Sequence, residues 1–401
     1  MSGARSGTYL IDTTLRDGLQ GCGRSLPHTR ATEIANALLD VGVGEIEAGI
    51  AMRSADRERI RRLRTEIPAS RLSVWCRLRR EDLDAARTCG VEVVHLSLPG
   101  SSRLLAAFGM DRRWRQTAVE RLLPQACGSF RRVSLGIQDA AGTEPADLLE
   151  LLHTAGNHGV ARLRLADSAG RWLPSQAAHC VGQLVPHAGS VELGVHAHDD
   201  LGLATAVSLA ALGAGAKSCD VTVCGIGERA GNAALEQVAL ACRVAGIRTG
   251  IHTQQLRRLA HLTMSTLGRR LAPDQPIVGG SCFAHQSGLH HAAMDRDVGC
   301  YEALPPEDVG AERSEPVGCH IGRAGLARAL RRLGLPSDGV QVAELLPRVI
   351  QAATRENRSL LDTELRTLAE SVQLPPAPDS RREPWPSTNP LTTSSSATAS
   401  A

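Results

Sequence analysis

The sequence has no long apolar segment. No stretch approaches the roughly 18 uninterrupted apolar residues that a transmembrane helix requires. The first residues, MSGARSGTYLIDTT, also lack the apolar core of a secretory signal peptide. We therefore expect neither membrane insertion nor secretion, and we expect a cytoplasmic protein.

An excess of charge of one sign is missing as well. The 401 residues include 45 basic and 42 acidic side chains, which leaves a formal net charge of +3. The arginines are scattered over predicted helix faces, so the sequence gives no indication of nucleic-acid binding. A local run of arginines is interpreted as the solvent-facing side of a helix rather than as an anion site: Arg57, Arg59, Arg61, Arg62 and Arg64.

The eleven cysteines include no CxxC pair and have no regular spacing. Several of them, such as Cys76, Cys219 and Cys224, fall within apolar, strand-like runs. A disulfide framework and a zinc knuckle are both disfavoured by this pattern, which is typical of small buried thiols in a reducing cytosol.

Apolar runs alternate with helical segments through the first 246 residues. We expect strands at residues 9–15, 45–50, 72–78, 91–98, 132–138, 162–166, 191–198 and 218–224. The intervening segments, such as residues 31–42, 80–90 and 146–159, have apolar residues at three-to-four spacing and end in glycine, as amphipathic helices do. Eight such units over roughly 240 residues predict an α/β fold, a closed (β/α)8 TIM barrel over residues 8–246. A doubly wound open sheet is less consistent, because no G-x-G-x-x-G follows a strand.

The alternation stops near residue 247. Helical patterns dominate residues 247–372, which we expect to form a helical C-terminal appendage. Residues 373–401 are rich in Pro, Ser and Thr and cannot bury enough apolar surface to order themselves, so they predict a disordered tail.

A candidate metal site comes from the segment HAHDDLGLA. His196 and His198 lie two residues apart at the end of a predicted strand, so both imidazoles should point to the same side. Arg16 and Asp17 follow the first predicted strand, and catalytic side chains of TIM barrels gather at the carboxyl ends of strands. Two imidazoles and one carboxylate would suit Mg²⁺, Mn²⁺ or Zn²⁺. The alternative is that the histidines are merely hydrogen-bonded at a strand end.

Several motifs, in chain order, resemble those of a known family. They are DTTLRDGLQ (residues 12–20), EIEAG (45–49), VHAHDDLGLA (195–204), GIGERAGNAALE (225–236) and FAHQSGLHH (283–291). The chain resembles the metal-dependent Claisen-condensing enzymes of the homocitrate synthase and isopropylmalate synthase family, and is most similar to the nitrogen-fixation type of homocitrate synthase.

The resemblance implies a set of metal ligands. Asp17, His196 and His198 would hold a divalent ion, with Asn232 close by as a further ligand. An open coordination sphere of this kind leaves sites for a chelating 2-oxo acid.

The resemblance also implies catalytic residues. Arg16 would stabilise the alkoxide that develops when the acetyl-CoA enolate attacks the keto acid, and Glu47 would orient Arg16. The alternative is a salt bridge at the barrel mouth without a catalytic role. His290 and Tyr301 resemble residues that reach the active site of a neighbouring subunit and assist proton transfer, which implies a homodimer. Their alternative role is in packing.

Substrate-binding residues are implied with one departure from the family pattern. Gln20 and Glu228 belong to the matched motifs, and Arg77 would either meet a distal substrate carboxylate or extend to the surface. Gln138 replaces the carboxylate usually found at the end of the fifth strand, and an amide cannot exchange protons usefully near neutral pH. Leu19 replaces the Glu of the usual RDGEQ and gives the RDGLQ of hydroxymethylglutaryl-CoA lyases.

The function implied first is an acyltransferase that joins acetyl-CoA to 2-oxoglutarate and water to give homocitrate and coenzyme A for nitrogenase cofactor biosynthesis. Sister condensations would use phosphonopyruvate, 2-oxoisovalerate, pyruvate or oxaloacetate. The RDGLQ sequence leaves a carbon–carbon lyase as one alternative function. The amide of Gln138 leaves a non-catalytic binding protein as another.

Overall fold

The computed structural model describes residues 7–23 and 25–372. They form two compact units. One contains the described residues up to Ala284 together with Glu302–Ser314, and the other contains His285–Tyr301 and the described residues from Glu315 onward. The predicted disordered tail, residues 373–401, lies outside the described residues.

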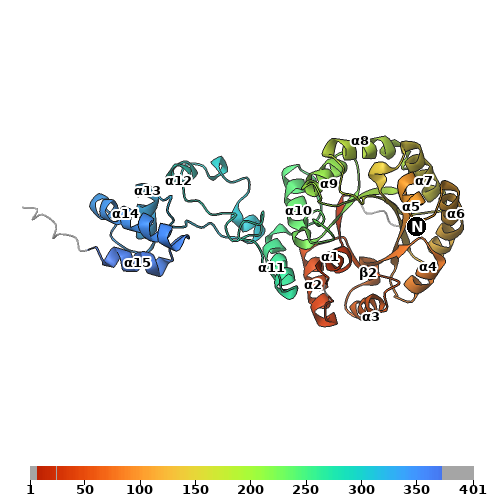
Figure 1. Ribbon diagram of the computed structural model, residues 1–401, viewed down its shortest axis with the longest axis horizontal. Helices are drawn as coiled ribbons and strands as arrows, with labels where there is room; N and C mark the ends of the chain where they lie inside the picture. The colour runs from red at the N-terminus through yellow and green to blue at the C-terminus, as the bar shows by residue number, and fades with distance from the viewer. Residues whose placement is uncertain (1–6, 24, 373–401) are drawn as a thin grey trace, which may run out of the picture. The chain divides into compact units, whose positions relative to one another are not determined.

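Eight parallel strands close into a barrel, and they pair in chain order until β8 returns to β1 (Figure 1). The strands are β1 (Tyr9–Asp12), β2 (Glu45–Ile50), β3 (Leu72–Arg77), β4 (Val93–Pro99), β5 (Arg132–Gln138), β6 (Arg162–Asp167), β7 (Glu192–Ala197) and β8 (Ser218–Val221). Closure is direct, since Ile11 of β1 is in register with Asp220 of β8. The predicted TIM barrel is confirmed.

Helices surround the barrel and make up most of the second unit. Those of the first unit are α1 (Leu19–Cys22), α2 (His28–Val41), α3 (Ser54–Leu63), α4 (Arg80–Arg87), α5 (Ser102–Ala107), α6 (Arg112–Cys127), α7 (Pro145–Asn157), α8 (Pro174–Leu184), α9 (Ala204–Gly213), α10 (Leu235–Val244) and α11 (Leu256–Thr266). Those of the second unit are α12 (Gly288–Met294), α13 (Arg323–Arg332), α14 (Gly339–Glu356) and α15 (Asp362–Glu370), in agreement with the predicted helical C-terminal region. Among the described residues, no helix is both long and apolar enough to cross a bilayer.

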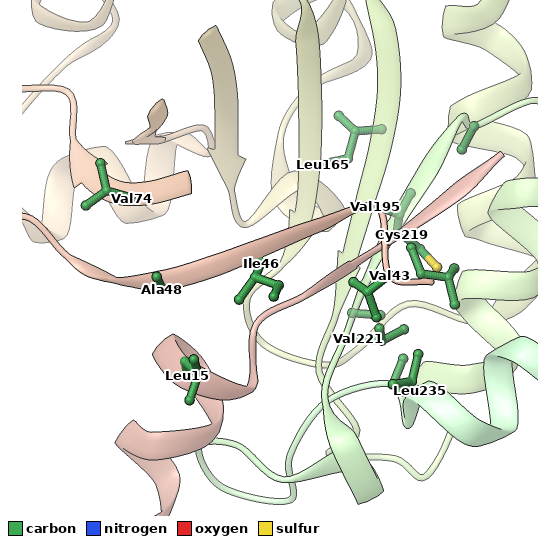
Figure 2. Packing of buried hydrophobic residues seen from close by; sticks show 14 of the residues in the cluster. Leu15, Val43, Ile46, Ala48, Val74, Leu165, Val195, Cys219, Val221 and Leu235 are labelled. Atoms are coloured by element: carbon green, nitrogen blue, oxygen red, sulfur yellow. The ribbon is translucent and has the colours of Figure 1, made fainter. Parts of the chain in front are cut away.

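The barrel strands are buried on both faces, and the two faces differ in chemistry. Ile46 and Ala48 of β2 belong to the hydrophobic cluster between the sheet and the helices (Figure 2). The alternate residues Glu45 and Glu47 are also fully buried, and they pair with arginines of β6. Successive side chains of a strand point to opposite faces of the sheet. The apolar side chains therefore pack outside the barrel, against the helices, and the ionic side chains lie inside it.

The cysteines agree with the sequence interpretation. All ten cysteines whose side chains are described are free thiols, and Cys76, Cys89, Cys219 and Cys242 among them are buried.

Two strands end three residues earlier than predicted. The first was expected to run to residue 15, but β1 stops at Asp12, whose carboxylate accepts hydrogen bonds from the backbone N–H and the hydroxyl of Thr14, both at 2.9 Å. The chain then winds into a π-helical turn, η1 (Thr14–Gly18). The last strand was expected to reach residue 224, but β8 stops at Val221 before a turn in which Cys224 adopts φ +56°. Local side-chain hydrogen bonds and a left-handed residue therefore end the pairing.

The arginine run of α3 is not uniformly solvent-facing, which corrects the sequence interpretation. Arg61 and Arg62 are about half exposed, but Arg59 is only 9% exposed. Its Nη2 donates hydrogen bonds to the carbonyls of Leu15 and Ala48, each at 3.0 Å, and pairs with Asp56 at 3.0 Å. Arg59 therefore ties the η1 turn to β2.

The ionic pair between Arg162 and Glu45 gives a test of the barrel interior. Two hydrogen bonds of 3.0 and 3.1 Å join the buried side chains, and although burial favours the neutral acid, Arg162 lowers the pKa of Glu45 to about 2. We expect Arg162→Met to destabilise the barrel by about 3–5 kcal/mol, because it leaves a buried carboxylate without its partner. The exposed pair Arg30–Glu33 supplies the control, and Arg30→Met should change stability by less than about 1 kcal/mol. Urea unfolding followed by circular dichroism measures both, and equal effects would contradict the interpretation.

Candidate active site

A chain of buried ion pairs crosses the mouth of the barrel. Asp17, in the η1 turn, accepts a hydrogen bond from Nη1 of the adjacent Arg16 at 2.9 Å. Arg16 Nε lies 2.5 Å from Oε1 of Glu47 on β2, and the other oxygen of Glu47 lies 3.0 Å from Nη2 of Arg164 on β6. One carboxylate thus bridges two guanidinium groups.

The chain of ion pairs closes on itself. Arg164 Nη1 lies 2.5 Å from Oδ2 of Asp220 on β8, and the same oxygen lies 2.9 Å from Nδ1 of His196 on β7. His196 Nε2 returns to Oδ2 of Asp17 at 3.3 Å. We call these six side chains the charge ring: Asp17, Arg16, Glu47, Arg164, Asp220 and His196.

The charge ring is one positive charge short. It contains three carboxylates and two guanidinium groups, so with a neutral imidazole its formal charge is −1. Burial opposes ionisation, yet Arg16 and His196 outweigh it and hold the pKa of Asp17 well below its usual range. Burial would likewise lower the pKa of His196, but Asp17 and Asp220 raise it. The site therefore attracts a cation, either a proton on His196 or a metal ion.

Three ligand atoms converge where a metal ion would restore the balance. Within the described residues, Asp17, His196 and His198 form the one group of this kind, with ligand atoms that all lie within 4.8 Å of one another. His196 Nε2 lies 3.3 Å from both His198 Nε2 and Asp17 Oδ2. Two ligands of one ion, each about 2.1 Å from it, are roughly 3.0–3.4 Å apart at neighbouring positions. The donor set and its spacing fit a divalent cation.

The groups behind these ligands support the same fit. Asp220 accepts the Nδ1 proton of His196, which directs the Nε2 lone pair toward Asp17 and His198. Burial and the neighbouring His196 lower the pKa of His198 to about 4, so its ring is neutral near pH 7. Oδ1 of Asn232 is buried without a hydrogen-bond partner, and the Asn232 backbone bridges to that of His198. Asn232 is therefore placed as a neighbour of the site, as the sequence implied.

The charge ring borders a cavity of about 510 Å³ at the carboxyl ends of the strands. Arg16, Asp17, His196 and His198 line it, and so do three predicted substrate-binding residues: Gln20, Gln138 and Glu228. Glu47 is fully buried behind Arg16. A larger cavity of about 610 Å³ lies between α7 and α8, and none of the predicted site residues lines it.

Five predicted site residues are not part of this cavity lining: Glu47 and Asn232, described above, and Arg77, His290 and Tyr301. Arg77 is half exposed and makes a two-pronged ion pair with Asp82, at 2.9 and 2.7 Å, which favours the surface position over the contact with a substrate carboxylate, the two roles left open by the sequence. His290 and Tyr301 belong to the second unit, where their rings stack with centroids 3.9 Å apart. Their proposed role stays a prediction.

Sequence reasoning missed several residues at the site. Arg164 and Asp220 complete the charge ring, and His95 and Trp75 line the cavity. A signal existed for Arg164, because Arg162 and Arg164 alternate with leucines in a run where both faces should be buried. Charged residues at alternate positions of such a strand indicate the barrel interior.

The backbone segments that begin and end the barrel meet at this cavity. A Cβ atom added to Gly21 would lie 1.7 Å from the carbonyl oxygen of Gly227. The main chains of α1 and of the turn after β8 are therefore in direct contact, between Gln20 on one side and Glu228 on the other.

Comparisons with known proteins agree with this geometry. Residues 8–263 match the HMGL-like family model, and residues 277–357 match the model described as homocitrate synthase post-HMGL domain-like. A homocitrate synthase of Frankia alni is 39% identical over 80% of this chain and 93% of its own length. A putative (R)-citramalate synthase of Methanopyrus kandleri is 36% identical over 92% of this chain and 73% of its own length. The crystal structure of the HMG-CoA lyase of Bacillus subtilis, 17% identical, shares the fold with a TM-score of 0.60 over 67% of this chain and 96% of that chain.

Metal binding tests the three convergent ligands. We expect His196→Ala to weaken Mn²⁺ binding by more than about 100-fold, because it removes the central ligand, and Asp220→Asn to weaken it about 10- to 100-fold through loss of the orienting carboxylate. Isothermal titration calorimetry with Mn²⁺ measures both. His261→Ala, an exposed histidine on α11, is the control and should bind as the wild type does. Unchanged affinity in His196→Ala would refute the site.

Proposed function

Because the chain belongs to the HMGL-like family, we propose that it condenses acetyl-CoA with a 2-oxo acid and releases coenzyme A. The observation that carries this proposal is the convergence of Asp17, His196 and His198 beside a fixed guanidinium, Arg16, in one cavity. The names of the relatives support it, since both are synthases of hydroxylated polycarboxylic acids.

A bound divalent cation would supply Lewis-acid polarisation of the keto group. The chain's own contribution is the position of Arg16. Arg16 lines the cavity, its Nε and Nη1 are held by Glu47 and Asp17, and its Nη2 makes no hydrogen bond or ion pair with another described residue. As the methyl carbon of the acetyl group loses a proton and bonds to the keto carbon, the carbonyl electron pair moves to oxygen. A prefixed guanidinium stabilises that charge without reorganisation.

Proton transfer is assigned to the second unit. We propose that His290 and Tyr301, whose rings stack, reach the cavity of a partner copy in a homodimer and take part in removing the methyl proton. Gln138 lines the cavity but its amide cannot serve as a base. Water then cleaves the thioester, which frees the coenzyme A thiol and makes the condensation irreversible.

The finer proposal concerns the keto acid. We propose 2-oxoglutarate, with homocitrate as the product and nitrogenase cofactor biosynthesis as its use. The name of the Frankia relative supports this choice. The citramalate synthase name of the second relative supports pyruvate as the sister substrate.

A panel of 2-oxo acids tests the reaction. Purified protein with Mn²⁺ and acetyl-CoA should release free thiol, measured with a chromogenic disulfide, only when a 2-oxo acid is added. 2-Oxoglutarate, pyruvate, oxaloacetate, 2-oxoisovalerate and phosphonopyruvate make up the panel, and omission of the metal is the control. Thiol release from a hydroxyacyl-CoA alone would identify a lyase instead, and no release with any acid would leave a binding protein.

The role of Arg16 has its own test. Arg16→Gln should lower kcat by about 10²- to 10³-fold, because it removes a preorganised donor to the developing oxyanion. Mn²⁺ affinity should change little, since the three ligands remain. Arg131→Gln, at a side chain that is 71% exposed, is the matched control and should retain wild-type kcat. A kcat loss below about 5-fold in Arg16→Gln would contradict the assigned role.

A further inference from the structure

The second strand of the barrel has a bulge beside the active site. Glu47 is in register with Ser73 of β3, and the next pair joins Ile50 to Trp75, so the chain advances three residues along β2 but only two along β3. The ladder of hydrogen bonds is disrupted at such a bulge, and bulges are frequent next to active sites. Glu47, which holds Arg16, is the last paired residue of β2 before the bulge.

Two buried side chains of α3 bind the backbone at this bulge. Oδ2 of Asp56 accepts a hydrogen bond from the N–H of Ile50 at 2.9 Å. Nη2 of Arg59 donates to the carbonyl of Ala48 at 3.0 Å and lies 3.0 Å from Oδ1 of Asp56. A Cβ atom on Gly49 would lie 2.9 Å from Cβ of Asp56 and 3.0 Å from Nη2 of Arg59. The glycine of the EIEAG motif therefore leaves room for this ion pair to reach β2.

The same nitrogen of Arg59 reaches the turn that carries Arg16. Nη2 also donates to the carbonyl of Leu15 in η1, at 3.0 Å. Leu15 precedes Arg16 in the chain, and Ala48 follows Glu47. One nitrogen atom thus bridges the backbone neighbours of both members of the Arg16–Glu47 ion pair. Arg59 does not line the cavity, and the side chains of Leu15 and Ala48 belong to the hydrophobic cluster behind it (Figure 2).

The orientation of Arg16 depends on the spacing between η1 and β2. Nε of Arg16 lies 2.5 Å from Oε1 of Glu47, and both side chains are buried, so a shift of one backbone segment against the other would misalign this hydrogen bond. The ring of Trp75, which is paired with the end of the bulge, lies 5.9 Å from the guanidinium carbon of Arg16. Oxyanion stabilisation requires a donor that is already in place, and a misplacement of about 1 Å can lower a rate about 100-fold.

We propose that Arg59 is a positioning residue of the reaction, whose Nη2 sets the spacing between η1 and β2 and thereby the orientation of Arg16. This inference rests on the proposed function. Arg59 acts through the backbone carbonyls of Leu15 and Ala48 and does not touch the substrate. Asp56 compensates the buried charge, since burial lowers the pKa of Arg59 and the neighbouring carboxylate opposes that shift.

Removal of the bridging nitrogen tests the proposal. Arg59→Met should lower kcat about 10- to 100-fold and change KM for the 2-oxo acid by less than about 3-fold, because it misplaces Arg16 without altering the substrate contacts. Arg59→Lys should restore kcat to within about 5-fold of the wild type, since one ammonium has three protons for the three acceptors around Nη2. Arg62→Met, at a half-exposed position of the same helix, is the matched control and should retain wild-type kcat.

A double-mutant cycle shows whether Arg59 acts through Arg16. If it does, Arg59→Met should lower kcat by less than about 3-fold once Arg16→Gln has removed the guanidinium, because the two changes remove the same contribution. A general loss of structure would lower kcat by the same factor in both backgrounds. The rates are measured at saturating Mn²⁺ and at a temperature where circular dichroism shows folded protein.

Two further measurements apply even where Arg59→Met fails to fold. Gly49→Ala keeps both charged side chains, but its Cβ displaces them from β2, and it should lower kcat by more than about 3-fold. Mn²⁺ affinity, measured by isothermal titration calorimetry, needs no turnover. Because Asp17 also belongs to η1, we expect Arg59→Met and Gly49→Ala each to weaken Mn²⁺ binding about 10-fold.

The outcomes separate the two proposals. Wild-type kcat in Arg59→Met, or equal losses in the two backgrounds of the cycle, would overturn the positioning role and leave the condensation standing. Arg59→Lys no more active than Arg59→Met would also overturn it. Absence of thiol release with every acid in the wild type would refute the proposed function itself. Mn²⁺ affinity would then decide the role of Arg59, and unchanged binding in both variants would overturn that role as well.

Discussion

The closed ring of six buried charged and titratable groups is the constraint on which this active site depends. Isolated charges are expensive to bury, and a buried ion pair is worth its desolvation only when its geometry is well satisfied. Each carboxylate of the charge ring therefore needs its partners at hydrogen-bonding distance. The partners come from the η1 turn, β2, β6, β7 and β8, so the ring can form only when the barrel has closed.

The same ring explains why its chemistry is concentrated on one side of the cavity. The ring is one positive charge short, which favours a cation at Asp17. Glu47, which fixes Arg16, also pairs with Arg164. The opposite strands carry neutral donors and a glycine.

Much of the fold could be predicted from the sequence because its signals are local. Strand and helix periodicity located all eight β/α units, and the spacing of His196 and His198 placed both imidazoles on one side. The prediction failed where partners distant in sequence decide the outcome. Arg59 was assigned to solvent because its acceptors, Leu15 and Ala48, are 44 and 11 residues away. Arg77 is a different case, because its partner Asp82 is only five residues on and favours the surface position that the sequence had left open.

The residues missed at the site have the same explanation. Arg164 and Asp220 join the charge ring only when the barrel closes, because closure brings β6 and β8 close to the charged groups of η1 and β2. The π-helical turn that aims Arg16 and Asp17 also has no periodic signature in five residues. Such turns concentrate at functional sites. Here a tertiary contact holds the turn, the hydrogen bond from Arg59 to the carbonyl of Leu15.

The contact between Gly21 and Gly227 has a mechanical consequence. The two main chains touch there, and a Cβ atom at Gly21 would overlap the carbonyl group of Gly227. Gln20 and Glu228, which line the cavity, are the chain neighbours of these two glycines. A larger residue at position 21 would therefore force the two segments apart and shift Gln20 relative to Glu228.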